Sequence, residues 1–272
     1  MLPLLVIVIL NGWVLYAGCL VISLMAAYEF FRGFRELDIK PNYPIAVCSI
    51  VALYLLGMLR YLAIRTTDGF SPVRVFSSET WIYLWIFGTV LACLLYLFSI
   101  EKRKLEDAMV TITGIFYVGF FCYTIGELAL MQELNILVWL VIITAFGTDI
   151  CAYFAGVTMG KHKLCPKISP KKTWEGAIGG ILGSVILSGL FGLFFAKEFL
   201  IHCLVIGFLA SIVSMFGDLT ASIFKRKMGI KDYGNLIPGH GGILDRFDSV
   251  LFTGPVVYFY AVIILQMFCF WL

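Results

Sequence analysis

The stretch KDYGNLIPGHGGILDRFDS, residues 231–249, places several carboxylates and cations between two long apolar runs. Its carboxylates are Asp232, Asp245 and Asp248. If a helix begins near Gly242, Asp245 and Asp248 are spaced i, i+3 and share one face of that helix. Carboxylates gathered in this way could hold a cation.

Further carboxylates lie inside apolar runs, where an ionisable residue is costly and usually marks a functional site. Asp218 precedes Lys225 by seven residues, which puts it roughly 10 Å from the end of a helix. Asp149 lies a little deeper in its own run. Glu127 falls toward the opposite end, so we expect its side chain to extend to that surface and to take no part in the site.

Carboxylates that meet beside many cations have two interpretations. Oxygen ligands suit Mg²⁺, which keeps water ligands and binds one or two carboxylates together with substrate phosphates. The alternative is a buried network of ion pairs that holds helices together, with Arg246 as a natural partner. The residues alone leave both interpretations open.

Two loops could also bind phosphate. In PGHGG (238–242), glycines would let backbone N–H groups approach an anion at a helix N-terminus. In KHKLCPKISPKKTWEGAIGG (161–180), Lys171 and Lys172 could cradle a polyphosphate after an extended segment that ends at Ser169-Pro170. Alternatively, Thr173 or Ser169 only caps the next helix, with Glu175 in its first turn.

Long apolar runs must position these residues. Of the 272 residues, 61% are hydrophobic and 14% are charged, a composition that indicates a membrane protein. The runs lie at about 1–31, 44–64, 80–99, 107–130, 136–159, 176–196, 200–224 and 249–272. Segments of this length can satisfy their backbone in lipid only as helices. We therefore predict an all-α integral membrane protein, a polytopic bundle of eight or nine transmembrane helices, because Asn11-Gly12 divides the first run.

Small residues and charges add two expectations about the bundle. The series GAIGGILGSVILSGLFG (176–192) indicates a face for close helix packing. Sixteen of the 20 Lys and Arg residues fall in alternate loops, at 32–43, 101–106, 160–175 and 225–248. Those loops are expected to be cytoplasmic, which places the C-terminus outside.

The stretch SIFKRKMGIKDYGNLIPGHGGILDRFD (222–248) resembles the motif of the phosphatidate cytidylyltransferases, also called CDP-diacylglycerol synthases. The matching residues are Ser222, Lys225, Arg226, Lys231, Asp232, Gly234, Pro238, His240, Gly241, Gly242, Asp245, Arg246 and Asp248. SPKKTWEG (169–176) and the preceding Asp149 also resemble this family.

The resemblance implies transfer of CMP from CTP to phosphatidate, giving CDP-diacylglycerol and pyrophosphate. It implies a Mg²⁺-dependent homodimer in the bacterial inner membrane, with its active site on the cytoplasmic side and no nucleic-acid partner; a second cation is left open. It also implies that Asp218 and Asp245 bind the metal. The residues assigned to catalysis are Asp218, Asp245, Asp248, Lys225, Arg226, Arg246 and His240. Those assigned to substrate binding are Ser169, Lys171, Lys172, Thr173, Glu175, Ser222, Lys231, Asp232, Gly241, Gly242 and Asp149.

The catalytic region is expected to be 107–272, after an N-terminal transmembrane region at 1–106. The alternatives are a CTP-dependent lipid kinase, a cytidylyltransferase for another lipid acid and, less favoured, a transporter. A transporter would need a site near the middle of the membrane, whereas these residues crowd toward one face.

Overall fold

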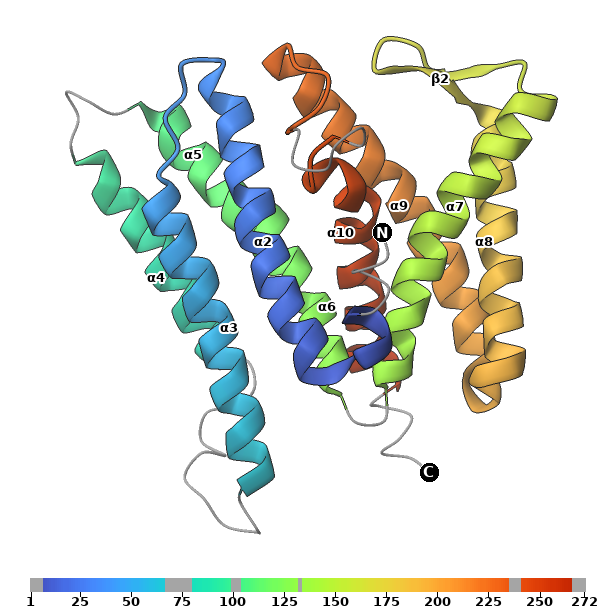
Figure 1. The fold of residues 1–272 in the computed structure, drawn as a ribbon, viewed down its shortest axis with the longest axis horizontal. Coiled ribbons are helices and arrows are strands. Elements are labelled where there is room, and N and C mark those ends of the chain that lie inside the picture. The colour runs from blue at the N-terminus through green and yellow to red at the C-terminus, as the bar shows by residue number, and fades with distance from the viewer. Residues whose placement is uncertain (1–6, 67–79, 99–103, 132–133, 235–240, 266–272) are drawn as a thin grey trace.

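The computed structural model describes residues 7–66, 80–98, 104–131, 134–234 and 241–265, which form a helical bundle (Figure 1). Over these residues, seven helices are long and apolar enough to cross a membrane, and Ile82–Leu97 is a shorter apolar helix. The prediction of an all-α polytopic membrane protein is therefore confirmed.

The elements agree with the apolar runs to within a few residues at most ends. The α-helices are α2 (Gly12–Arg35), α3 (Tyr43–Thr66), α4 (Thr80–Leu97), α5 (Leu105–Gly114), α6 (Phe121–Leu130), α7 (Val138–Met159), α8 (Trp174–Phe195), α9 (Leu200–Met228) and α10 (Leu244–Tyr260). The short helical segments are η2 (Ile115–Phe120), η3 (Asn135–Leu137), η4 (Lys197–Phe199) and η5 (Ala261–Leu265). Segment η2 joins α5 to α6 in one span, and η5 extends α10. Helix α10 begins at Leu244, close to the helix start near Gly242 that the sequence suggested, and therefore includes Asp245 and Asp248.

The first apolar run is interrupted at Asn11 and Gly12, as predicted. Both residues have positive φ, 47° and 51°, a conformation that Asn and Gly adopt most readily. The Asn11 side chain accepts a hydrogen bond from the Gly12 N–H (2.8 Å), where α2 begins. Residues 1–6 lie outside the described part of the chain, so the choice between eight and nine spans stays a prediction.

Helices α7, α8 and α9 pack together on one side of the bundle, α3, α4 and α5 lie on the other, and α2, α6 and α10 lie between them (Figure 1). The glycines of α8 provide the close contact. A Cβ atom at Gly180 would lie only 3.0 Å from the Ala152 Cβ and from the Thr148 carbonyl oxygen of α7. On the other face, the Ser184 hydroxyl donates to the Gly207 carbonyl of α9 (3.2 Å). The predicted small-residue packing face is confirmed.

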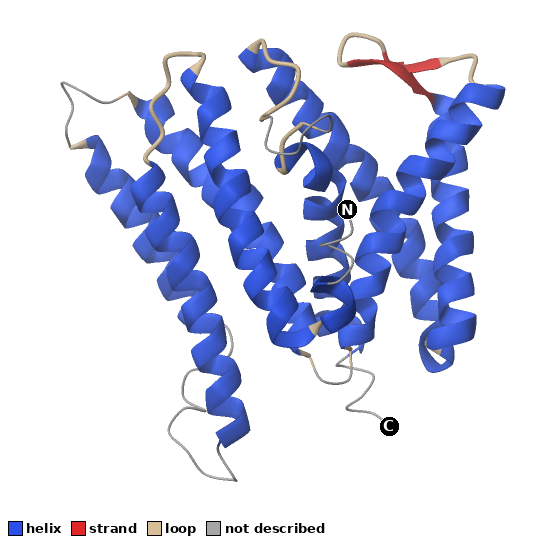
Figure 2. Ribbon diagram, in the orientation of Figure 1, coloured by secondary structure: helices blue, strands red, loops and turns tan. Residues whose placement is uncertain are grey.

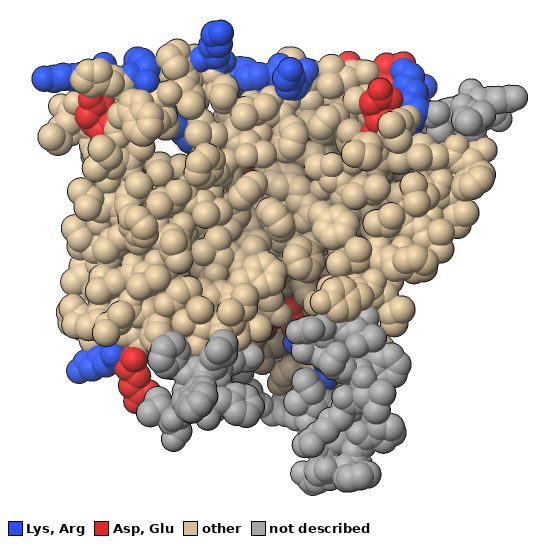
Figure 3. Space-filling model, turned by 180° about the vertical axis from the view of Figure 1, so that it is seen from behind, with Lys and Arg blue, Asp and Glu red and all other residues tan. Residues whose placement is uncertain are grey.

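Several connecting segments lie along one end of the bundle (Figure 2). They include an antiparallel hairpin of β1 (Lys163–Cys165) and β2 (Ser169–Thr173), in which Lys163 pairs with Thr173 and Cys165 with Ser169. The expectation that the extended segment ends at Ser169-Pro170 is wrong, because this pairing continues the strand to Thr173. Lys and Arg side chains gather along the same end (Figure 3). The side of the membrane that this end faces stays a prediction.

Candidate active site

Carboxylates from three helices meet near the charged end of the bundle. Asp149 of α7, Asp218 of α9 and Asp248 of α10 are close enough to repel one another electrostatically. Serines hold them: Ser222 Oγ donates to Asp218 (3.4 Å), and Ser249 donates from its hydroxyl to Asp149 (3.2 Å) and from its backbone N–H to Asp248 (2.8 Å). These three predicted site residues therefore lie near one another.

Two lysines balance part of this negative charge. Lys172 Nζ of β2 lies 2.5 Å from Asp218 Oδ2, with the side chains 26% and 29% exposed. Lys225 Nζ of α9 lies 2.7 Å from Asp245 Oδ1, and this pair is more buried, at 15% and 6% exposed. The first ion pair ties the hairpin to α9, and the second ties α9 to α10.

A pocket of about 480 Å³ opens beside Asp149 and Asp218. The hairpin contributes Lys163, Leu164, Ser169, Lys171, Lys172 and Thr173 to its lining. Apolar or small residues of α7, α8 and α9 complete it, among them Ala152, Tyr153, Val157, Ala177 and Met215. Tyr153 and Val157 are also exposed on the outer surface of α7. The pocket thus combines a cationic wall with an apolar wall that includes exposed residues of α7.

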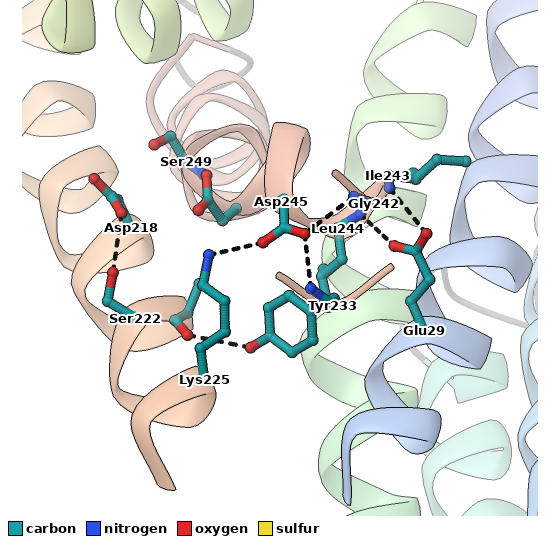
Figure 4. A network of polar contacts seen from close by, with 12 residues as sticks. Glu29, Asp218, Ser222, Lys225, Tyr233, Gly242, Ile243, Leu244, Asp245 and Ser249 are labelled. Atoms are coloured by element: carbon teal, nitrogen blue, oxygen red, sulfur yellow. Dashed lines mark hydrogen bonds and ion pairs between the residues drawn. The ribbon is translucent and has the colours of Figure 1, made fainter. Parts of the chain in front are cut away.

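The loop between α9 and α10 supplies backbone partners to Asp245. Gly229 adopts the left-handed conformation (φ 70°) and ends α9. Beyond the loop, Asp245 Oδ2 accepts hydrogen bonds from the N–H groups of Tyr233 (2.8 Å) and Gly242 (3.1 Å), and Oδ1 remains for Lys225 (Figure 4). The loop backbone therefore fixes the direction of the Asp245 carboxylate.

Tyr233 anchors the same loop. Its hydroxyl donates to the Ala221 carbonyl of α9 (3.3 Å). Burial raises the pKa of Tyr233 above its ordinary value, and Tyr117, Asp245 and Asp248 raise it further. The hydroxyl therefore stays neutral and remains a hydrogen-bond donor.

Other predicted residues lie at the edge of the site. Arg226 is exposed, and its Nε donates to the Ile168 carbonyl of the hairpin (3.5 Å). Lys231, Asp232 and Arg246 are exposed as well. A Cβ atom at Gly241 would lie 3.3 Å from Asp245 Oδ2. Pro238 and His240 lie outside the described residues.

The hairpin residues also explain how α8 begins. The Thr173 hydroxyl accepts a hydrogen bond from the Gly176 N–H (3.1 Å), so Thr173 rather than Ser169 is the cap. The Glu175 carboxylate, in the first turn, accepts a hydrogen bond from the backbone N–H of His162 (3.2 Å) and forms a second one with Nδ1 of His162 (2.7 Å). Thr173 and Glu175 thus have structural roles, while Lys171 and Lys172 face the pocket.

Sequence reasoning missed one buried carboxylate near the site and misjudged another far from it. Glu29 of α2 is 4% exposed and accepts hydrogen bonds from the backbone of Ile243 (3.0 Å) and Leu244 (2.8 Å). The rule that identified Asp149, an ionisable residue inside an apolar run, would have found Glu29.

The expectation that Glu127 extends to the surface is wrong. Glu127 is 3% exposed, and Arg60 of α3 forms an ion pair with it.

The acidic site fits Mg²⁺ only in part. Its side-chain donors are oxygens, which Mg²⁺ prefers. Among the residues that the structure describes, however, no group of three His, Cys, Asp or Glu side chains could hold a metal ion. Mg²⁺ commonly keeps water ligands and takes one or two carboxylates together with substrate phosphates. The residues therefore fit a metal site that the substrate completes.

The structure is a helical membrane bundle with a site of carboxylates and lysines at one end. Comparison with known proteins identifies the family to which the chain belongs. The model of the cytidylyltransferase family matches residues 1–264, so the chain belongs to this family. It is 32% identical to a phosphatidate cytidylyltransferase of Synechocystis sp. over 291 residues, covering 96% of this chain and 92% of the relative. The phosphatidate cytidylyltransferase of Bacillus subtilis is 39% identical over 156 residues, 57% of this chain and 58% of the relative. Phosphatidate cytidylyltransferase 4, chloroplastic, of Arabidopsis thaliana is 31% identical over 285 residues, 94% of this chain and 69% of the relative. The resemblance inferred from the motif is confirmed.

Proposed function

We propose that this chain transfers CMP from CTP to phosphatidate, producing CDP-diacylglycerol and pyrophosphate for phospholipid synthesis. The observation that carries the proposal is the pocket between the hairpin and α7–α9, where Lys172 pairs with Asp218 beside an apolar wall. A polyanionic nucleotide needs the cations, and a lipid needs access from the membrane. The names of the relatives support the same substrates.

In the proposed reaction, a phosphate oxygen of phosphatidate attacks the α-phosphorus of CTP. A new P–O bond forms, the bond from the α-phosphorus to the β-bridging oxygen breaks, and pyrophosphate leaves with that electron pair. The second pKa of a phosphate monoester is about 6, so the attacking group is already ionised near neutral pH. The reaction needs no general base, and the main barrier is repulsion between two polyanions.

The cations of the site are suited to lowering that barrier. Lys171 and Lys172 of β2 would bind the triphosphate at the mouth of the pocket. Lys225, now paired with Asp245, would help to stabilise the charge that develops during transfer. The acyl chains of phosphatidate would remain in the membrane beside Tyr153 and Val157, while the head group enters the pocket.

We propose Mg²⁺ as the cofactor, held by Asp218 and Asp245 with Asp149 and Asp248 in support. Bound there, it would neutralise part of the triphosphate charge and polarise the α-phosphate. The oxygen donors and the mutual repulsion of Asp149, Asp218 and Asp248 support a cation beside Asp218, because a cation between repelling carboxylates relieves their repulsion. The assignment of Asp245 rests on the family resemblance.

We further propose that the charged end faces the cytoplasm of a bacterial inner membrane, that the C-terminus is outside, and that the protein is a homodimer. The sixteen Lys and Arg residues in loops of one side support the orientation. The dimer rests on the family resemblance, and its test is the mass of the purified protein in nanodiscs.

The reaction is tested with CTP radiolabelled on either its α- or its γ-phosphorus. Purified protein in phosphatidate-containing nanodiscs should move α-label, but not γ-label, into lipid. Label from the γ-position in lipid, with the α-label left in soluble nucleotide, would instead identify a lipid kinase and refute the proposal.

A further inference from the structure

The buried carboxylate of Glu29 caps the helix that carries the motif aspartates. Its Oε1 accepts from the Ile243 N–H (3.0 Å) and its Oε2 from the Leu244 N–H (2.8 Å) (Figure 4). Helix α10 begins at Leu244, and the residue at its own cap position, Ile243, supplies no side-chain hydrogen bond. A residue of α2 therefore does what an N-cap residue usually does for its own helix.

Three successive backbone N–H groups at the start of α10 donate to carboxylates, and two of them donate to Glu29. Asp245 accepts from Gly242, and Glu29 accepts from Ile243 and Leu244. A carboxylate at this end also interacts favourably with the helix dipole. Removing Glu29 would leave one buried and one partly buried N–H group without these partners, which favours a shift of the helix start.

Two glycines of the motif leave room for the Glu29 carboxylate. A Cβ atom at Gly234 would lie 2.6 Å from Glu29 Oε1, and one at Gly242 would lie 2.5 Å from Oε2. Both distances are shorter than a van der Waals contact. A larger residue at either position would therefore displace the carboxylate or the loop.

Helix α2 is itself held against α9, so Glu29 has a fixed position relative to Asp218. Phe30, next to Glu29, is fully buried, and its ring centroid lies 5.4 Å from that of Phe224 of α9. It also packs on Tyr117 of η2, at 5.6 Å. The cap is therefore part of a rigid contact between the N-terminal region and the site.

We propose that Glu29 is a positioning residue for the cytidylyltransferase reaction: it sets the start of α10 and thereby the placement of Asp245 and Asp248 opposite Asp218. The catalytic consequence rests on the proposed function, whereas the structural consequence does not. The region 1–106, which the sequence suggested to be separate from catalysis, thus supplies a determinant of the site.

The test is Glu29→Gln, with Asp107→Asn as a matched control. Glutamine keeps the length of the side chain but turns one acceptor into an N–H donor that faces a backbone N–H. Asp107 is also buried, at 2% exposed, and also accepts two backbone hydrogen bonds, from Lys40 (2.7 Å) and Lys104 (3.0 Å). Its partners belong to the loop before α3 and to the start of α5, so its loss should destabilise the fold without moving α10.

In protein that remains folded, Glu29→Gln should lower kcat by about tenfold or more with little change in KM for CTP, because small misplacements of reacting groups are costly. Asp107→Asn should keep kcat within about twofold of wild type at a comparable loss of thermal stability. An unchanged kcat in Glu29→Gln, or an equal loss of kcat in Asp107→Asn, would overturn the positioning role.

Hydrogen exchange separates this inference from the proposed reaction. Glu29→Gln should speed amide exchange at Ile243 and Leu244 by about tenfold or more, whatever reaction the protein catalyses. Unchanged exchange would refute the cap even if the enzyme is a cytidylyltransferase. Faster exchange in a protein that labels no lipid from α-labelled CTP would retain the cap and refute the function.

A double-mutant cycle adds a test of the glycine contact. Gly242→Ala should impair kcat strongly in the wild-type background but much less beside Glu29→Ala, where the carboxylate no longer fills the space. Additive effects of the two substitutions on kcat would contradict the contact.

Discussion

Replacing Lys172 with methionine removes the cation that joins the hairpin to Asp218 while keeping most of the side-chain volume. Lys172 Nζ lies 2.5 Å from Asp218 Oδ2. At an effective dielectric constant of about 20, unit charges at this distance attract by about 7 kcal/mol. Each side chain is about a quarter exposed, so desolvation and screening reduce the net cost of the lost pair to about 1–3 kcal/mol.

The effect on catalysis follows from what Lys172 would bind instead of Asp218. A charge-assisted hydrogen bond to a phosphate oxygen is worth about 1.5–3 kcal/mol. Because 1.4 kcal/mol corresponds to about tenfold, Lys172→Met should lower kcat/KM for CTP by about 10- to 100-fold. Lys171 is exposed on the same strand, so Lys171→Met should raise KM for CTP only about two- to fivefold.

Steady-state kinetics with varied CTP at saturating phosphatidate measures both variants. The ratio of the two kcat/KM values isolates the contribution of the partly buried Lys172, because the two substitutions are adjacent and equal in size. Equal values for the two variants would refute the reasoning that the partly buried ion pair marks the phosphate contact.

The remaining predictions concern the carboxylates at both ends of the bundle. Asp218→Asn and Asp245→Asn should each reduce kcat by about a hundredfold or more while the protein stays folded; near-normal Mg²⁺-dependent turnover would remove the metal assignment. At the opposite end, Glu127→Gln should lower the free energy of unfolding by about 1–3 kcal/mol because it removes the charge of Glu127 from the ion pair with Arg60, whose side chain is 25% exposed. Its kcat in folded protein should stay within about twofold of wild type, and a large loss of kcat would link that end to the reaction.

Hydropathy predicted the spans well because a helix is the only way for an isolated apolar segment to satisfy its backbone in lipid. Hydropathy also identified Asp149 and Asp218, because a carboxylate at that depth is energetically costly and usually marks a functional site. The glycine series of α8 was readable because close helix contact requires small side chains. These features depend on one segment at a time, which is why the sequence was sufficient.

Features that depend on two distant segments could not be read in this way. The hairpin forms because Lys163 and Thr173 pair across a turn, and its short strands have no strand-like alternation of apolar residues. Arg60 and Glu127 neutralise each other from separate helices, and no periodicity reports such a pair. Glu29 acts on backbone N–H groups 214 and 215 residues away, and N–H groups leave no mark in a sequence.

We propose that the carboxylates beneath the charged end hold the cation that supports transfer of CMP from CTP to a lipid phosphate. This proposal is tested most directly by following α-labelled CTP with wild type and Asp218→Asn in phosphatidate nanodiscs. Wild type should form labelled CDP-lipid and pyrophosphate in equal amounts, and Asp218→Asn should form both about a hundredfold or more slowly. Labelled lipid made at an undiminished rate by Asp218→Asn, or no labelled lipid from folded wild type, would contradict the account.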